Sequence, residues 1–175
     1  MVMALVLGGF LGMEVLVYLS HRFLMHGPGL PVHKSHHQRR PEPGFEGNDL
    51  YPLAGSALAM LGFAIGLNVG GMEALVPIGV GLTIYGVAYF FVHDVYIHRR
   101  LPWFSAEVAV LERLKEAHRI HHLWAGEPYG MLLPLVPAAL RERAAAVDYD
   151  PFPPARRPAP ASASGSAPSQ VPVEP

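Results

Sequence analysis

The 175-residue sequence contains no cysteine. This absence excludes disulfide bonds, iron–sulfur clusters held by thiolates, thiolate-ligated haem and blue copper. Any bound metal must therefore be held by nitrogen and oxygen. Charged residues are also scarce, at 15% of the chain, and the formal net charge is only −1. The composition thus offers no basic field for nucleic acid, and we expect no nucleic-acid partner.

Lysine and arginine are also missing before the first apolar run, and no small-residue cleavage site follows it. We therefore expect a retained membrane anchor rather than a removable signal peptide. Three apolar runs, 2–19, 53–69 and 75–92, are long enough to span a bilayer, because about 18 helical residues extend roughly 27 Å. The sequence predicts an all-α integral membrane protein with about three transmembrane helices.

The cations are placed unevenly. They follow the first run or lie from Arg99 onward, and none lies in the 68–74 turn. By the positive-inside rule, the N-terminus faces outward, and the cationic regions and the C-terminus face the cytoplasm. The protein is thus expected in the cytoplasmic membrane.

The remaining chain is more polar. Residues 105–124 read as an amphipathic helix with Ser105 as its N-cap, whereas 129–140 is too short to span and is interrupted by proline. From Pro151 the composition turns to proline, alanine and serine, which is typical of disorder. We expect one membrane domain over 1–150 and a disordered tail over 151–175.

All ten histidines fall into one repeated pattern, H-x4-H followed by H-x2-H-H. The first copy comprises His21, His26, His33, His36 and His37, and the second comprises His93, His98, His118, His121 and His122. A single histidine on an apolar face is usually structural, but ten in a repeated pattern, all on one side of the membrane, indicate metal ligands.

Helical geometry constrains how these histidines can meet. The i, i+3 and i+4 positions of H-x2-H-H share one helix face, so each trio could direct three imidazoles at one ion. Positions i and i+5 diverge by about 140° on a regular helix, so H-x4-H requires the helix to end or deform. Gly27 and Pro28 would provide such an ending after His26.

Ten nitrogen donors exceed the needs of one ion, whereas two ions with about five donors each fit the count. We therefore expect a di-metal site on cytosolic histidine-bearing helices. The imidazoles alone do not identify the metal. Because metal-bound imidazoles usually donate their other N–H to a carboxylate or carbonyl, Glu14, Asp49 and Asp94 are candidate partners, with ordinary structural acids as the alternative for the two aspartates.

The sequence motifs around the histidines resemble those of a known family. GMEVLVYLSHRFLMHG, HKSHH, FEGNDLY, YGVAYFFVHDVYIHRRLP and AHRIHH resemble the bacterial β-carotene 3-hydroxylases of the fatty-acid-hydroxylase-like membrane di-iron group. The boxes alone also occur in fatty-acid desaturases and hydroxylases and in carotenoid ketolases. The flanking words and the short chain are similar to the carotene hydroxylases specifically.

The resemblance implies a monooxygenase with two non-haem iron ions held by the ten histidines. It implies that O2 is used to hydroxylate carbon 3 of β-ionone rings, converting β-carotene through β-cryptoxanthin to zeaxanthin. An unactivated C–H bond calls for redox-capable iron rather than zinc. Electrons would come from ferredoxin and an NAD(P)H-dependent ferredoxin reductase, because the chain has no dinucleotide fingerprint. The substrate would arrive through the membrane lipid.

Two other functions remain open. One keeps the metal site and replaces the carotenoid with a fatty acyl or sterol lipid. The other is a membrane protein that binds or transports metal. The fixed, repeated histidine spacing and the absence of a polar path across the spans argue against transport.

Overall fold

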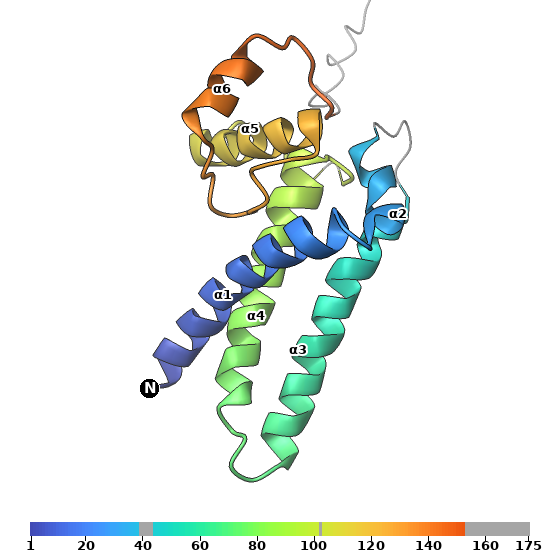
Figure 1. Cartoon of the computed structure of the whole chain (residues 1–175). Coiled ribbons are helices and arrows are strands. Elements are labelled where there is room, and N and C mark those ends of the chain that lie inside the picture. The colour runs from blue at the N-terminus through green and yellow to red at the C-terminus, as the bar shows by residue number, and fades with distance from the viewer. Residues whose placement is uncertain (39–43, 102, 153–175) are drawn as a thin grey trace, which may run out of the picture.

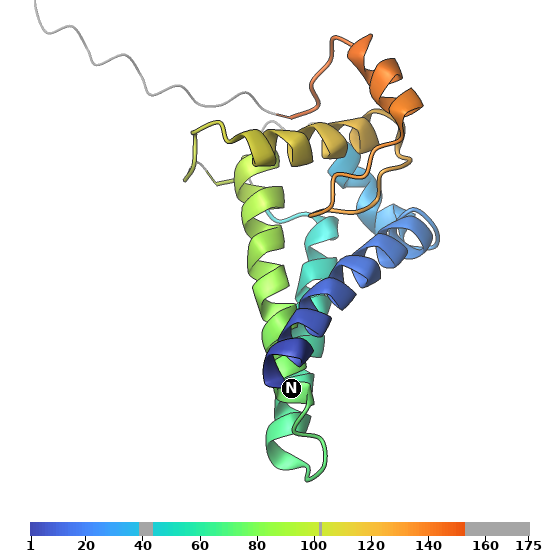
Figure 2. The same ribbon diagram turned by 90° about the vertical axis from the view of Figure 1, so that its left-hand side faces the viewer.

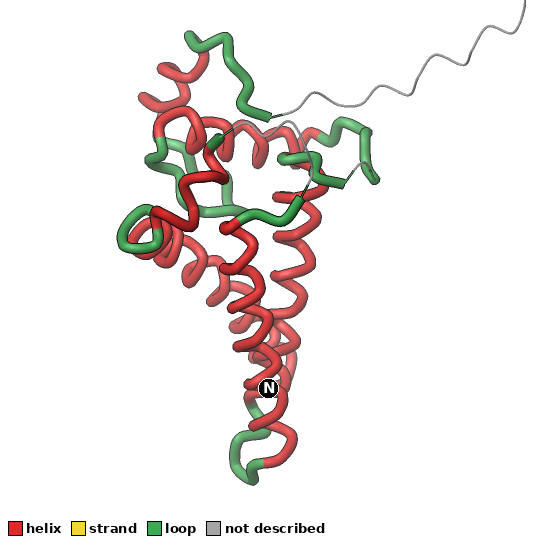
Figure 3. The backbone as a smooth tube through the Cα atoms, turned by 90° about the vertical axis from the view of Figure 1, so that its right-hand side faces the viewer, coloured by secondary structure: helices red, strands yellow, loops and turns green. Residues whose placement is uncertain are grey.

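The computed structural model describes residues 1–38, 44–101 and 103–152. Arg39, Arg40 and the tail predicted to be disordered lie outside these ranges, apart from Pro151 and Phe152. Across the described ranges the chain forms helices and turns without a β-strand (Figure 3). The all-α prediction is confirmed.

Three long helices form the body of the molecule: α1 (Val2–Leu19), α3 (Leu50–Asn68) and α4 (Leu75–Phe90). Together with short helical extensions, each is long and apolar enough to cross a membrane. Large apolar side chains on their outer surfaces are exposed, for example Leu11 at 60%, Leu61 at 56% and Val87 at 65%. Such surfaces are stable in lipid rather than in water, so this is a membrane protein with three predicted spans, as expected.

Helix α1 crosses α4 obliquely, while α3 and α4 form a hairpin through the 68–74 turn (Figures 1 and 2). The crossing is close because two glycines lie in it. A Cβ on Gly9 would come within 2.5 Å of the Ile78 carbonyl oxygen, and one on Gly81 within 2.2 Å of the Val6 carbonyl oxygen. Backbones can approach this closely only where side chains are absent.

The shorter elements lie at the end of the spans opposite the 68–74 turn. Two π-helical segments, η1 (Ser20–Met25) and η4 (Phe91–Ile97), extend α1 and α4. The short helices α2 (Leu30–His33), η2 (Lys34–His37) and η3 (Gly47–Asp49) connect α1 to α3. Helix α5 (Ala109–Trp124) lies across this end, with α6 (Ala138–Ala145) beyond it (Figure 1).

Helix α5 begins later than the sequence suggested. Val108 is its N-cap and is extended, so the expectation of Ser105 as N-cap is wrong. The backbone N–H of Val108 donates to the Tyr96 hydroxyl at 3.2 Å, which ties the segment before α5 to η4. A tertiary contact thus sets the start of the helix. The segment predicted not to span forms a non-helical stretch that leads into α6.

Candidate metal centre

Each H-x4-H pair lies on a π-helical turn. The backbone N–H of His26 donates to the His21 carbonyl at 3.0 Å, and that of His98 donates to the His93 carbonyl at 2.8 Å. These i→i+5 hydrogen bonds define the π-helix, whose wider turn brings residues five apart closer to one face than a regular α-helix does. The expected helix deformation is confirmed as a widened turn in both copies, and in the first copy the helix also ends, as expected, with His26 as the C-cap directly before Gly27 and Pro28.

Nine of the ten histidines form two groups. Within each group the ligand atoms all lie within 4.8 Å of one another. Group one comprises His21, His26, His33, His37 and His121, and group two comprises His36, His98, His118 and His122. His93 joins group two, because its Nε2 atom lies 3.0 Å from His36 Nε2. With His93 included, each group contains five histidines, which is the number of nitrogen donors expected for one of the two ions.

The two copies of the repeat exchange one histidine. Group one otherwise consists of histidines from the first copy, but it includes His121 from the second. Group two otherwise consists of histidines from the second copy, but it includes His36 from the first. Each H-x2-H-H trio, which by helical geometry alone could direct three imidazoles at one ion, is instead divided between the two groups. On α5 the reason is geometric: neighbouring residues such as His121 and His122 diverge by about 100° around a helix, so they can face two ions that lie side by side.

Carbonyl oxygens orient three imidazoles of group one. His21 Nδ1 lies 3.0 Å from the Tyr129 carbonyl oxygen, His33 Nδ1 2.7 Å from Asn48 Oδ1, and His121 Nδ1 2.6 Å from the Gly126 carbonyl oxygen. A carbonyl oxygen only accepts, so each Nδ1 carries the proton and each Nε2 keeps a lone pair.

These Nε2 lone pairs face other ring nitrogens. His21 Nε2 and His33 Nε2 are 3.2 Å apart, as are His26 Nε2 and His121 Nε2. No proton lies between His21 and His33, so this arrangement is favourable only around a cation. Ligands about 2.1 Å from an ion are roughly 3.0–3.4 Å apart in octahedral or tetrahedral geometry. The residues present therefore fit a bound metal ion.

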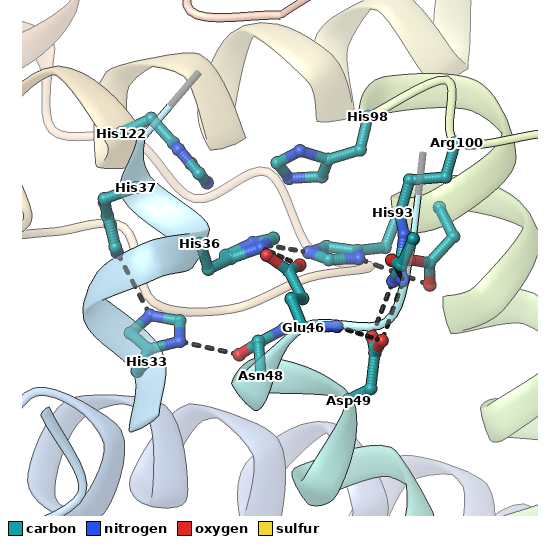
Figure 4. Close-up of polar contacts among 12 residues, drawn as sticks. His33, His36, His37, Glu46, Asn48, Asp49, His93, His98, Arg100 and His122 are labelled. Carbon is teal, nitrogen blue, oxygen red and sulfur yellow. Dashed lines mark hydrogen bonds and ion pairs between the residues drawn. The ribbon is translucent and has the colours of Figure 1, made fainter. Parts of the chain in front are cut away.

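Carboxylates replace carbonyls beside group two. His36 Nδ1 donates to Glu46 Oε1 at 2.9 Å (Figure 4). His93 Nδ1 lies 3.4 Å from Asp94 Oδ2. Both carboxylates are largely buried, with side chains 6% and 10% exposed. Asp94 thus lies beside a candidate ligand, but its hydrogen bond to His93 stays a prediction, because His93 Nδ1 has no hydrogen-bond partner among the described residues.

Burial also sets the protonation state of the histidines outside the spans. It lowers the pKa of His33 to about 4 and that of His37 to about 3. It lowers the pKa of His36, His98, His118, His121 and His122 well below the usual value, and neighbouring imidazoles lower it further. These rings are therefore neutral near pH 7, which is the form that binds metal.

Asp49 forms an ion pair with Arg100, which also contacts Asp94. Its two oxygens receive Arg100 Nη1 and Nη2 at 2.6 and 2.7 Å, and the same Nη1 donates to Asp94 Oδ1 at 2.8 Å. Asp49 Oδ2 also accepts the backbone N–H of Glu46 at 2.9 Å. Asp49 thus fixes the segment that carries Glu46, and its hydrogen bonds in the structure are to Arg100 and this backbone rather than to an imidazole.

Glu14 likewise has partners other than the expected imidazole. It is 7% exposed, and its carboxylate accepts hydrogen bonds from the Tyr85 hydroxyl and from three consecutive backbone N–H groups, those of Met131, Leu132 and Leu133, at 3.1–3.2 Å. These residues directly follow the segment that supplies the Tyr129 and Gly126 carbonyls. Glu14 therefore anchors this segment to α1.

Sequence reasoning missed several orienting groups. Glu46 and Asn48 lie in FEGNDLY, where only Asp49 was selected, although an acid and an amide so close to Asp49 were a usable signal. The carbonyls of Gly126 and Tyr129 left no side-chain signal. Ala125, which has a left-handed φ of 51°, ends α5 and precedes the Gly126 carbonyl that meets His121.

Comparison with known proteins gives a consistent result. The model of the fatty acid hydroxylase family matches residues 6–139. The chain is 42% identical over 142 residues to a beta-carotene hydroxylase of Pantoea ananas, covering 76% of this chain and 79% of that protein. It is 37% identical over 127 residues to a beta-carotene hydroxylase of Paracoccus sp. (strain PC1), covering 71% and 76% of the two chains.

A plastid relative is similar over a smaller part of its length. The chloroplastic beta-carotene 3-hydroxylase of Haematococcus lacustris is 42% identical over 137 residues, which are 74% of this chain and 42% of that protein. No solved structure matches the chain significantly. The family match covers all ten histidines and most of the described residues, and so the chain belongs to the fatty acid hydroxylase family.

Proposed function

We propose that this protein is a non-haem di-iron carotenoid hydroxylase that converts β-carotene through β-cryptoxanthin to zeaxanthin. The observation that carries the metal site is the convergence of histidine Nε2 atoms in two groups, with neighbouring Nε2 atoms 3.0–3.2 Å apart. The carotenoid substrate is supported by bacterial and plastid relatives that bear the name beta-carotene hydroxylase.

The overall reaction uses one O2, two electrons and two protons to place one hydroxyl on carbon 3 and release one water. Two iron ions, held by groups one and two, would supply the redox chemistry that O2 reduction and C–H oxidation require. Residues around the histidines keep the imidazoles neutral and oriented for metal binding. Carbonyls and carboxylates hold the Nδ1 protons, and burial keeps the imidazoles neutral.

The position of the histidines suits an apolar substrate. The elements that carry them, among them α2 and α5, lie at one end of the three candidate spans (Figures 1 and 2). The outer surfaces of these spans expose leucine and valine side chains. A carotenoid dissolved in membrane lipid would therefore reach the metal centre from the bilayer without crossing water. In the proposed orientation this end and the C-terminus face the cytoplasm, and the N-terminus faces outward.

Electrons would arrive from ferredoxin and an NAD(P)H-dependent ferredoxin reductase. The sequence lacks a dinucleotide-binding fingerprint, which supports separate donors. The defining experiment incubates membranes containing the protein with β-carotene, ferredoxin, the reductase and NADPH. We expect cryptoxanthin and then zeaxanthin. Oxidation of a fatty acyl or sterol lipid without a hydroxylated carotenoid would instead support the lipid-hydroxylase alternative.

Two variants connect the metal groups to turnover. His36→Ala and His121→Ala each remove the histidine that one copy contributes to the other group. We expect both to abolish hydroxylation, because each leaves one ion short of a ligand. Near-normal turnover in either variant would contradict the two-iron model. A metal transporter would instead retain weakened uptake after the loss of a single histidine.

A further inference from the structure

A phenylalanine at the end of the described chain packs directly on histidines of group two. The Phe152 ring is stacked on His118 with the ring centroids 5.7 Å apart, and its centroid lies 4.9 Å from that of His98 and 5.2 Å from that of His122. All three histidines belong to group two. Phe152 lies beyond the match to the family model, which ends at residue 139, and no sequence motif selected it.

The segment 147–152 is exposed to solvent on its outside and buried at its end. It follows α6 and arcs over α5, at the end of the molecule away from the 68–74 turn (Figure 1). Tyr149 is 51% exposed and Asp150 is exposed as well, whereas Phe152 is only 2% exposed. Asp150 Oδ1 accepts the backbone N–H of Phe152 at 2.9 Å, which helps to turn the chain inward. The Phe152 ring therefore lies between the solvent-exposed segment and the imidazoles.

Cations of α5 hold this segment in place. Arg119 Nε donates to the Tyr149 carbonyl at 2.9 Å, and Arg119 Nη2 donates to the Val147 carbonyl. Lys115 Nζ lies 3.6 Å from Asp150 Oδ2. Residues four apart, such as these two cations, share one face of a helix. Helix α5 thus provides both candidate metal ligands and the groups that anchor the segment covering them.

An aromatic ring in this position limits the access of water to group two. Phe152 belongs to the apolar core, where it packs with Val92, Tyr96, Ile97, Leu114 and Met131. The apolar surroundings of a metal site control its exposure to solvent. Loss of the phenyl ring would leave room for water, which occupies about 30 Å³ per molecule in the liquid, beside imidazole nitrogens that offer polar partners. Exclusion of water from a reactive site also limits side reactions.

We infer that residues 147–152 form a strap that closes the metal centre to water, with Phe152 sealing group two and Arg119 holding the strap on α5. This inference rests on the proposed two-metal function. It gives a role at the metal centre to a part of the chain that carries no histidine. It predicts that removal of the ring exposes the ion of group two to reagents dissolved in water.

The test measures how fast a water-soluble chelator removes iron. The full-length protein in nanodiscs is loaded anaerobically with ferrous ion and mixed with excess ferrozine, and formation of the coloured complex is followed over time. Phe152→Ala should release one of the two ions at least about tenfold faster than the wild type, which is the lower end of the effect of groups around metal ligands. The other ion should be released at the wild-type rate.

Three further variants provide the comparison. Phe152→Leu keeps an apolar side chain and should stay closer to the wild-type rate than to that of Phe152→Ala. Tyr149→Ala removes an exposed ring from the same strap but keeps the carbonyl that Arg119 binds, so it should change neither rate. Arg119→Ala releases the strap without changing the Phe152 ring and should speed release of the same ion. If Phe152→Ala does not fold, Arg119→Ala and Phe152→Leu still decide the question.

The outcomes separate the strap from the proposed function. Release of both ions from Phe152→Ala at the wild-type rate would overturn the seal and leave the two-metal function intact. Equal acceleration of both ions would also overturn it, because a purely structural role of the ring would loosen the whole centre. A wild-type rate for Arg119→Ala would overturn the role of Arg119 in holding the strap. A wild-type protein that binds fewer than two ferrous ions would overturn the proposed function itself.

Discussion

The carboxylate of Glu14 gives the sharpest test of how the spans support the metal centre. Glu14→Gln preserves shape but leaves one acceptor oxygen where two received the Tyr85 hydroxyl and three backbone N–H groups. The new NH2 group would face donors. Losing about two charge-assisted hydrogen bonds, each worth about 1.5–3 kcal/mol, should lower the free energy of unfolding by roughly 3–6 kcal/mol.

This loss corresponds to a fall in melting temperature on the order of 10 °C for a chain of this size. The assay is thermal unfolding of the purified protein in detergent, measured as the fraction that still elutes in the native peak on size-exclusion chromatography after heating. The matched control is Glu73→Gln in the exposed 68–74 turn, where the carboxylate accepts one N–H from Gly71. We expect the control to shift the melting temperature by no more than about 2 °C. An equally small shift for Glu14→Gln would refute the anchoring role.

Three further predictions concern protonation, backbone strain and topology. Burial lowers the pKa of His33 and His37 to about 4 and 3, below the unfolded value of about 6.5, so the unfolded chain binds more protons below that value. The metal-free protein should therefore lose stability as the pH falls from about 6.5 toward 4 in denaturant titrations, and equal stability across this range would contradict the burial. Ala125→Gly should raise the melting temperature by about 2–4 °C, because glycine tolerates a φ of 51° that costs alanine about 1 kcal/mol; an unchanged or lower value would show that the strain is absent. Because the chain has no cysteine, Met72→Cys and Glu142→Cys can be labelled singly: an impermeant maleimide should reach the first in intact cells and the second only after lysis, and the reverse would invert the proposed orientation.

Local patterns in the sequence predicted the elements that depend on local chemistry. The first apolar run coincides with α1, and the other two spans lie within a few residues of α3 and α4. The H-x4-H spacing predicted a deformed helix, because five residues do not make a whole number of regular turns. The structure provides this deformation as the two π-helical segments.

The grouping of ligands depended on contacts that no local pattern contains. His26 meets His121 across 95 residues, and His93 meets His36 across 57 residues. Helix periodicity says which residues share a face, but the packing of α1 on α4 and the course of α5 decide which faces converge. The sequence therefore predicted the number of donors and left open which histidines serve which ion; the packing divides each H-x2-H-H trio between the two groups.

The sequence by itself determined a cysteine-free membrane protein with three apolar spans and ten histidines in a repeated pattern, since these follow from composition and spacing. Only the tertiary structure decided that His36 lies in group two and His121 in group one, that Glu14 holds the backbone of Met131 to Leu133, and that the Glu46 carboxylate accepts a hydrogen bond from His36. The physical reason is that hydrogen bonds to a buried group are satisfied by whatever the fold brings near it. Such partners can be more than 100 residues away in the chain.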